Sequence, residues 1–235
     1  MPWRIGLIIT QRRKLGNRGQ ATFVLYGGSF NPVHRGHVAL VHQVLETVTA
    51  DHLLIIPARV SPFKQHAPPL PDELRVAMLR AALGSTPRVS LLDVELRLPP
   101  PSYTIHTVRR LASQLPCVRF LWAMGSDGFP LFRQWYHADA LLELTSLLVV
   151  ARRGAGTPPD AESARQALPG EWPARTEVRQ GQVVVRDSGR AVVCFAQLEL
   201  PEVASSDILQ QRQLEDVPPA ARPLLERYWR DHPDG

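Results

Sequence analysis

The 235-residue sequence contains no apolar run near the roughly 20 residues that a helix needs to cross a bilayer. It has only two cysteines, Cys117 and Cys194, which do not form a Cys-x-x-Cys pair. Two lone cysteines argue against a disulfide framework and fit a reducing compartment. We therefore expect a cytoplasmic protein with no membrane partner, and we interpret both cysteines as buried thiols.

Lysine is also scarce, because only Lys14 and Lys64 accompany 25 arginines. The formal net charge is +5, but the basic residues are scattered along the chain. Scattered charge of this kind indicates a solvated basic surface, so we expect no nucleic-acid partner. The sequence does not indicate an oligomeric state.

Two nucleotide-binding signatures are missing. No Gly-x-x-x-x-Gly-Lys-[Ser/Thr] loop occurs, and the one Gly-Gly pair after a predicted strand lacks the Gly-x-Gly-x-x-Gly spacing. Residues 5–9 are too short for the apolar core of a signal peptide, and no small-residue cleavage site follows them. We therefore interpret residues 1–20 as a flexible N-terminal tail and residues 21–235 as a single domain.

Predicted strands and helices alternate along that domain. Short apolar runs predict strands at residues 23–26, 51–57, 89–96, 118–124 and 146–151. Helical periodicity or helix-start signals lie between them, and this alternation predicts a Rossmann-like α/β fold with a doubly wound parallel sheet. The pattern breaks at residues 152–190, which we interpret as an insertion ending in a hairpin, with strands at 182–186 and 191–195.

The segment from Tyr26 to His37 reads YGGSFNPVHRGH and joins a predicted strand to a predicted helix. Gly27 and Gly28 allow a ligand to approach the backbone closely because they have no Cβ. The free N–H groups of the helix's first turn favour an anion, and His34 and His37 can share one side of that turn. The segment therefore predicts a phosphate-binding site.

The same residues allow a second interpretation, because His-x-x-His can be half of a metal site. No third ligand with suitable spacing is present, so we expect no protein-bound metal. A second helix begins at Ser205 and Ser206, and Asp127 lies at the end of a predicted strand. Together these features suggest a nucleotide polyphosphate held between two helix N-termini.

Residues 27–37 resemble the G-G-[TS]-F-[DN]-P-x-H-x-G-H signature of the nucleotidyltransferase superfamily with the H-x-G-H motif. Residues 203–209, VASSDIL, are similar to the I-S-S-T-x-I-R motif of that superfamily. Three further segments resemble one family within that superfamily, the bacterial nicotinate-nucleotide adenylyltransferases. They are residues 61–64 (SPFK), residues 101–104 (PSYT) and Gly125-Ser126-Asp127 followed by Trp135.

The resemblance implies transfer of the adenylyl group of ATP to nicotinate mononucleotide, which gives nicotinate adenine dinucleotide and pyrophosphate. It places His34 and His37 at the triphosphate as the catalytic residues, with no general base, because the attacking phosphate is already anionic. Mg²⁺ would be bound mainly through the ATP phosphates. The implied ATP-binding residues are Gly27, Gly28, Ser29, Phe30, Gly125, Asp127, Arg152, Ser205 and Ser206, and the implied acceptor-binding residues are Lys64, Tyr103, Thr104 and Trp135.

The chain departs from the family at one phosphate-binding position. The arginine of I-S-S-T-x-I-R falls on Leu209 or, after a shift of one residue, on Gln210. Arg212 could supply the cation one helical turn later. Two alternatives stay open, which are a sister transferase such as phosphopantetheine adenylyltransferase and a non-catalytic nucleotide-binding protein. The sequence does not distinguish nicotinate from nicotinamide mononucleotide as the acceptor.

Overall fold

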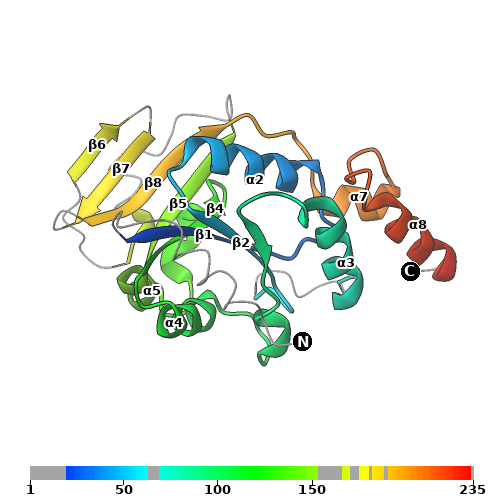
Figure 1. Cartoon of the computed structure of the whole chain (residues 1–235), viewed down its shortest axis with the longest axis horizontal. Helices are drawn as coiled ribbons and strands as arrows, with labels where there is room; N and C mark the ends of the chain where they lie inside the picture. The colour runs from blue at the N-terminus through cyan, green and yellow to red at the C-terminus, as the bar shows by residue number, and fades with distance from the viewer. Residues whose placement is uncertain are drawn as a thin grey trace.

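The computed structural model of the chain describes residues 20–62, 69–152, 166–169, 175–179, 182–187 and 190–233. In this part of the chain a single sheet carries helices on both of its faces (Figure 1). Residues 1–19, Lys64 and most of the predicted insertion lie outside the described residues. The predicted tail and the boundaries of the insertion therefore stay predictions.

Six strands of the sheet run parallel and confirm the predicted doubly wound architecture. Their order is β3 (Val89–Leu91), β2 (His52–Pro57), β1 (Ala21–Gly28), β4 (Val118–Gly125), β5 (Thr145–Arg152) and β8 (Arg190–Leu198). The chain starts in the middle at β1, builds outward to β3, and then returns to β4 on the other side of β1. The strand order therefore reverses between β1 and β4.

Two antiparallel strands, β7 (Gln182–Asp187) and β6 (Arg175–Arg179), extend the sheet beyond β8 (Figure 1). The predicted hairpin is confirmed as the β7–β8 pair. Its second strand, however, is the sixth strand of the parallel sheet, because β8 pairs with β5 over residues 193–198. The sequence patterns did not predict β6.

Burial of both faces explains why the central strands are continuous apolar runs. All six residues of β2 are buried, as expected for a parallel strand covered on both sides. In β1, Phe23 and Leu25 belong to one core layer and Val24 to the other, in keeping with the two-residue period of a strand.

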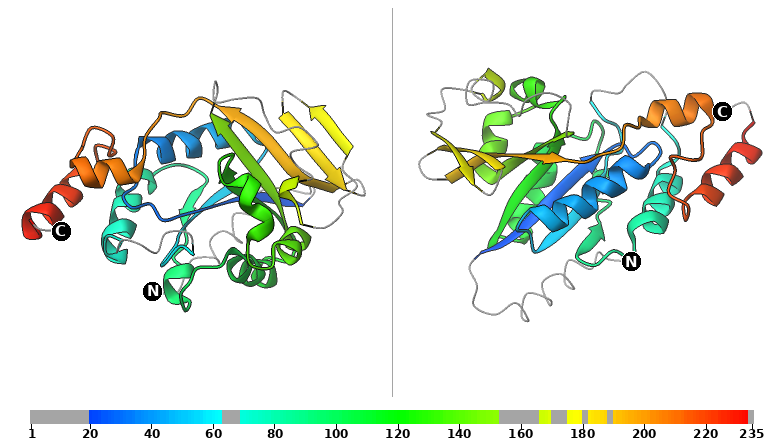
Figure 2. Two further views of the ribbon diagram at one scale, coloured as in Figure 1. Left: turned by 180° about the vertical axis from the view of Figure 1, so that it is seen from behind. Right: turned by 90° about the horizontal axis from the view of Figure 1, so that it is seen from above.

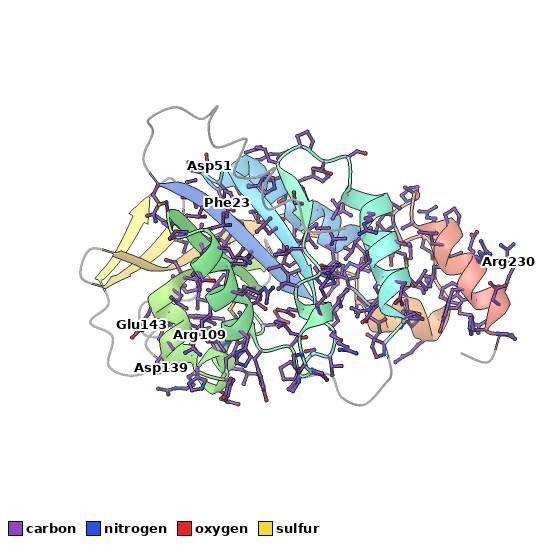
Figure 3. The ribbon with its side chains drawn as sticks, turned by 60° about the horizontal axis from the view of Figure 1, so that its bottom comes forward. Phe23, Asp51, Arg109, Asp139, Glu143 and Arg230 are labelled. Carbon is purple, nitrogen blue, oxygen red and sulfur yellow. The ribbon has the colours of Figure 1, made fainter. Side chains whose placement is uncertain are left out.

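The helices divide between the two core layers (Figures 1 and 2). One layer is completed by α4 (Thr104–Gln114) and α5 (Ala138–Leu144), and the other by α2 (Arg35–Thr47), α3 (Asp72–Leu83), α7 (Ser205–Gln211) and α8 (Arg222–Asp231). Figure 3 shows the exposed polar side of the first layer, with Arg109 on α4 and Asp139 and Glu143 on α5. None of the described helices has the length and apolar character to cross a membrane.

Three expectations from the sequence are wrong in detail. β3 ends at Leu91 instead of residue 96, because the chain turns into the 3-10 helix η1 (Glu95–Arg97), where the Asp93 carbonyl accepts the Leu96 N–H. The Gly-Gly pair belongs to strand β1, which ends at Gly28, and does not follow the strand as expected. Cys117 is exposed, since it lies in the turn before β4, and Cys194 is only partly buried.

Candidate active site

A strained turn connects β1 to α2. Phe30 has a left-handed backbone (φ 46°), which is unfavourable for a residue with a side chain, yet only 2% of its surface is exposed. Its ring packs edge-on against Tyr26 at 5.4 Å and His37 at 4.9 Å between ring centroids. The side-chain oxygen of Asn31 accepts the backbone N–H of Leu70 at 2.8 Å. These contacts hold the turn that aims the start of α2.

The two histidines lie together at the start of α2, as predicted. His34 is the residue before the helix and is buried, and its ring stacks on the His37 ring with centroids 3.7 Å apart. The His34 backbone N–H donates to Nδ1 of His37 at 3.1 Å. Because Nδ1 is an acceptor there, the ring proton of neutral His37 is on Nε2. His37 therefore presents an N–H donor from a ring whose orientation is fixed.

A buried arginine that the sequence analysis missed supports the turn between β1 and α2. Only 1% of Arg75, on α3, is exposed, and its guanidinium donates to the carbonyl oxygens of Ser29 (2.6 Å), Ala58 (2.8 Å) and Leu70 (3.1 Å). It also pairs with the Asp72 carboxylate. Its one sequence signal was its place on the apolar face of α3, where an arginine must find several acceptors.

The second predicted helix start lies against the same corner. The Ser205 hydroxyl, at the first residue of α7, donates to the Pro32 carbonyl at 3.0 Å. Arg35 bonds to Asp216 twice, through its backbone N–H to the carbonyl at 2.8 Å and through its guanidinium to the carboxylate at 2.7 Å. Ser206 is exposed, and its hydroxyl bonds to Asp207. The C-terminal region thus closes over the start of α2.

A cavity of about 580 Å³ opens where the strand order reverses, at the carboxyl ends of β1 and β4. It brings together eight of the predicted residues, which are Gly27, Gly28, Ser29, Gly125, Asp127, Tyr103, Thr104 and Trp135. The cavity has the size of a typical small-molecule site. A Cβ on Gly27 would lie 2.5 Å from the Trp122 ring, so this position admits only glycine unless the indole moves.

Several side chains that line the cavity were not predicted. Trp122 was indistinguishable from a core residue within an apolar strand. Tyr136 is half exposed and lies 4.5 Å from the Tyr103 ring, between centroids. Glu95 is buried and accepts the Thr107 hydroxyl at 2.7 Å. Burial raises the pKa of Glu95 to about 7, although hydroxyl bonds from Thr107 and Ser102 oppose the shift. Burial also raises the pKa of Tyr26, which keeps this phenol neutral.

Other predicted residues do not line the cavity. Among them are the residues of the turn and helix starts described above, which are Phe30, His34, His37, Ser205 and Ser206. Arg152 ends β5 at the same edge of the sheet, but its side chain is outside the described part of the structure. Arg212 follows α7 with a left-handed backbone, donates to the Pro233 carbonyl at 2.6 Å and lies 5.8 Å from the Trp229 ring centroid. Its contacts direct it toward α8, so they do not support the predicted replacement of the family arginine. Leu209 packs partly buried in the apolar core.

No group of three or more His, Cys, Asp or Glu side chains is placed to hold a metal ion in the described ranges of the chain.

A doubly wound parallel sheet with a cavity at its switch point, beside a glycine-ended strand and a helix start, defines the class of mononucleotide-binding α/β proteins.

Comparison with known proteins narrows that class. A family model for cytidylyltransferase-like proteins matches residues 25–212, and the chain belongs to this family. It is 37% identical over 130 residues to a probable nicotinate-nucleotide adenylyltransferase of Bacteroides fragilis (strain YCH46), covering 55% of this chain and 65% of the relative. It is 30% identical over 215 residues to a protein of the same name from Synechococcus sp. (strain JA-2-3B'a(2-13)), covering 88% and 94%.

A solved structure shares the fold. The nicotinic acid mononucleotide adenylyltransferase of Plasmodium falciparum, complexed with NaAD, superposes with a TM-score of 0.65 and 14% identity, covering 89% of this chain and 96% of that chain. At this identity the likeness supports the Rossmann-like fold, in agreement with the strand order.

Proposed function

We propose that the protein is a nicotinate-nucleotide adenylyltransferase, which joins ATP and nicotinate mononucleotide to give nicotinate adenine dinucleotide and pyrophosphate in NAD biosynthesis. The observation that carries the proposal is the cavity that runs from the glycine end of β1 to the aromatic wall of Tyr103 and Trp135. A site for this reaction must bring the acceptor phosphate to the α-phosphate of ATP and must hold the pyridine ring further along the cavity. The two borders offer one surface for the ATP phosphates and another for the ring. The names of the similar proteins agree with this substrate pair.

ATP occupies the side of the cavity next to α2. Gly27, Gly28 and Ser29 allow its phosphates to approach the backbone, and Phe30 fixes the turn beneath them. The stacked imidazoles and the starts of α2 and α7 provide N–H donors and a positive field. Gly125 and Asp127 border the ribose, while Ser205, Ser206 and Arg152 lie toward the phosphates in this proposal.

The acceptor occupies the opposite side. Trp135 and Tyr103 provide aromatic surface for the pyridine ring, and Thr104 lies at the start of α4. Lys64 is a predicted acceptor-binding residue, and it lies outside the described residues.

The reaction requires positioning and charge stabilisation. A phosphate oxygen of the acceptor, whose second pKa is near about 6, attacks the α-phosphorus of ATP, and the bond to the β-phosphate oxygen breaks. The attacking oxygen carries no proton to remove, so His34 and His37 act on the triphosphate and its transition state rather than as bases. The phosphates would provide the oxygen ligands that Mg²⁺ prefers, and Mg²⁺ held there would offset part of their charge.

Pyrophosphate release tests the proposal. Purified protein is mixed with ATP, Mg²⁺ and one of three acceptors, which are nicotinate mononucleotide, nicotinamide mononucleotide or phosphopantetheine. Release with nicotinate mononucleotide supports the proposal, and the ratio of kcat/KM for the two pyridine nucleotides gives the preference. Release with phosphopantetheine alone would identify a sister transferase, and ATP binding without turnover would indicate a non-catalytic protein. We also propose a cytoplasmic location, which the absence of paired cysteines favours.

A further inference from the structure

One buried carboxylate beside the cavity has no part in the reaction described above. Glu95 begins the 3-10 helix η1, is only 4% exposed and lines the cavity. A buried carboxylate is costly unless hydrogen bonds compensate it. Its partners are the hydroxyls of Thr107, on the second turn of α4, and of Ser102, just before that helix. The carboxylate therefore contacts both sides of the start of α4.

The Ser102 hydroxyl carries this connection to another segment. Its oxygen accepts the backbone N–H groups of Arg59 at 3.0 Å and Val60 at 3.4 Å. The Ser102 N–H in turn donates to the Val60 carbonyl at 2.9 Å. A hydroxyl has one proton and two lone pairs, so both lone pairs are used and the proton is left for Glu95. The loop after β2 and the start of α4 are thus joined through one serine and one carboxylate.

The segments so joined form one wall of the cavity. Ser61 and Pro62 follow the loop residues, Tyr103 and Thr104 follow Ser102, and all four line the cavity. We propose that Glu95 is a positioning residue for the acceptor nucleotide, which it serves by holding this wall in place through Ser102 and Thr107. This inference rests on the proposed function for the identity of the acceptor.

Other ionisable groups surround Glu95, so an experiment must separate the hydrogen bonds of Glu95 from its charge. On its own segment Asp93 and Arg97 pair with each other at 3.1 Å. The elements around it also carry Arg59 after β2, His106 on α4, and Tyr26 and Asp127 on the cavity. Variants that keep the size of the side chain therefore separate its hydrogen bonds from a general change in charge.

The experiment compares Glu95→Ala, Glu95→Gln and Ser102→Ala with the wild type in steady-state kinetics. We expect Glu95→Ala and Ser102→Ala to raise KM for nicotinate mononucleotide roughly 10-fold, as for the loss of one net hydrogen bond, with KM for ATP within about twofold. Glu95→Gln keeps an acceptor for Thr107 and should restore KM to within about threefold. Ser90→Ala is the matched control, because it removes a hydroxyl bonded to His52 away from the cavity.

Hydrogen exchange gives a second measurement that needs no substrate. In Glu95→Ala the amides of Arg59 and Val60 should exchange at least 10-fold faster, while the Asp51 amide, bonded to the Thr22 carbonyl, should not change. Equal rises in both KM values, an unchanged acceptor KM, or unchanged exchange at Arg59 and Val60 would overturn the inference. A wild type inactive with nicotinate mononucleotide would reject the proposed function, and the exchange data would still decide whether Glu95 holds the wall.

Discussion

Replacing Arg75 with methionine should weaken both the fold and ATP binding. The substitution keeps the long apolar stem and removes the guanidinium that bonds to the carbonyls of Ser29, Ala58 and Leu70. A hydrogen bond from a charged donor contributes about 1.5 to 3 kcal/mol. Removing the guanidinium also removes the cost of burying its charge, which offsets part of the loss of these hydrogen bonds. The Asp72 side chain is 31% exposed, so its carboxylate can be hydrated instead. We expect a net loss of about 4 kcal/mol in the free energy of unfolding.

The assay is a thermal melt followed by an ATP titration at a temperature where both proteins are folded. A loss of about 4 kcal/mol in a chain of this length lowers Tm by about 10 °C. KM for ATP should rise roughly 10-fold, because the Ser29 carbonyl and the turn after β1 lose their support.

The control is Arg88→Met. The Arg88 guanidinium also donates to two carbonyls, those of Ala50 at 3.1 Å and Leu45 at 3.2 Å, but at the opposite end of the sheet. This variant should lower Tm and leave KM for ATP unchanged. The reasoning is refuted if Arg75→Met melts within 2 °C of the wild type, or if both variants change KM for ATP equally.

Three further predictions concern the cavity and its border. The double variant His34→Ala/His37→Ala should lower kcat about 100- to 1,000-fold and lower Tm by a few degrees, because both rings pack at the start of α2, and undiminished dinucleotide synthesis would contradict the assigned role. Gly27→Ala should cost about 1 to 3 kcal/mol in urea unfolding, because its Cβ would meet the Trp122 ring, and an unchanged urea midpoint would show that the indole moves freely. The raised pKa of Glu95, about 7 against an ordinary value of 4.5, means that the folded protein holds this proton more tightly. The associated stability is present at low pH and is lost as pH rises through about 7, so the urea midpoint of the wild type should fall between pH 5.5 and 8 relative to Glu95→Gln. Parallel pH profiles would reject this.

The sheet and the glycine–histidine corner could be predicted because their signals are local. The buried strand β2 is one uninterrupted apolar run, and the segment from Gly27 to His37 carries its turn, helix start and imidazoles together. Contacts between distant residues left no such signal. Arg75 and Ser29 are 46 positions apart, and an arginine within a helix is in most cases an exposed one.

Two errors have a different origin. The helical pattern around Leu209 suggested that Arg212 continued the same face, but a left-handed residue ends α7 at that point and turns the side chain away. The apolar run at 89–96 predicted a full strand, but local hydrogen bonds of Asp93 end the pairing at Leu91. In both places a short-range backbone preference prevailed over the periodicity.

The contact between Ser205 and Pro32 joins residues 173 positions apart, and Arg35 reaches still further, to Asp216. During synthesis on a ribosome, which releases the N-terminus first, the glycine–histidine corner therefore waits for nearly the whole polypeptide. A chain that ended near residue 200 would contain all the strands but would lack the contacts of Ser205 and Asp216 with the start of α2. Incomplete translation products of this chain should accordingly be catalytically silent.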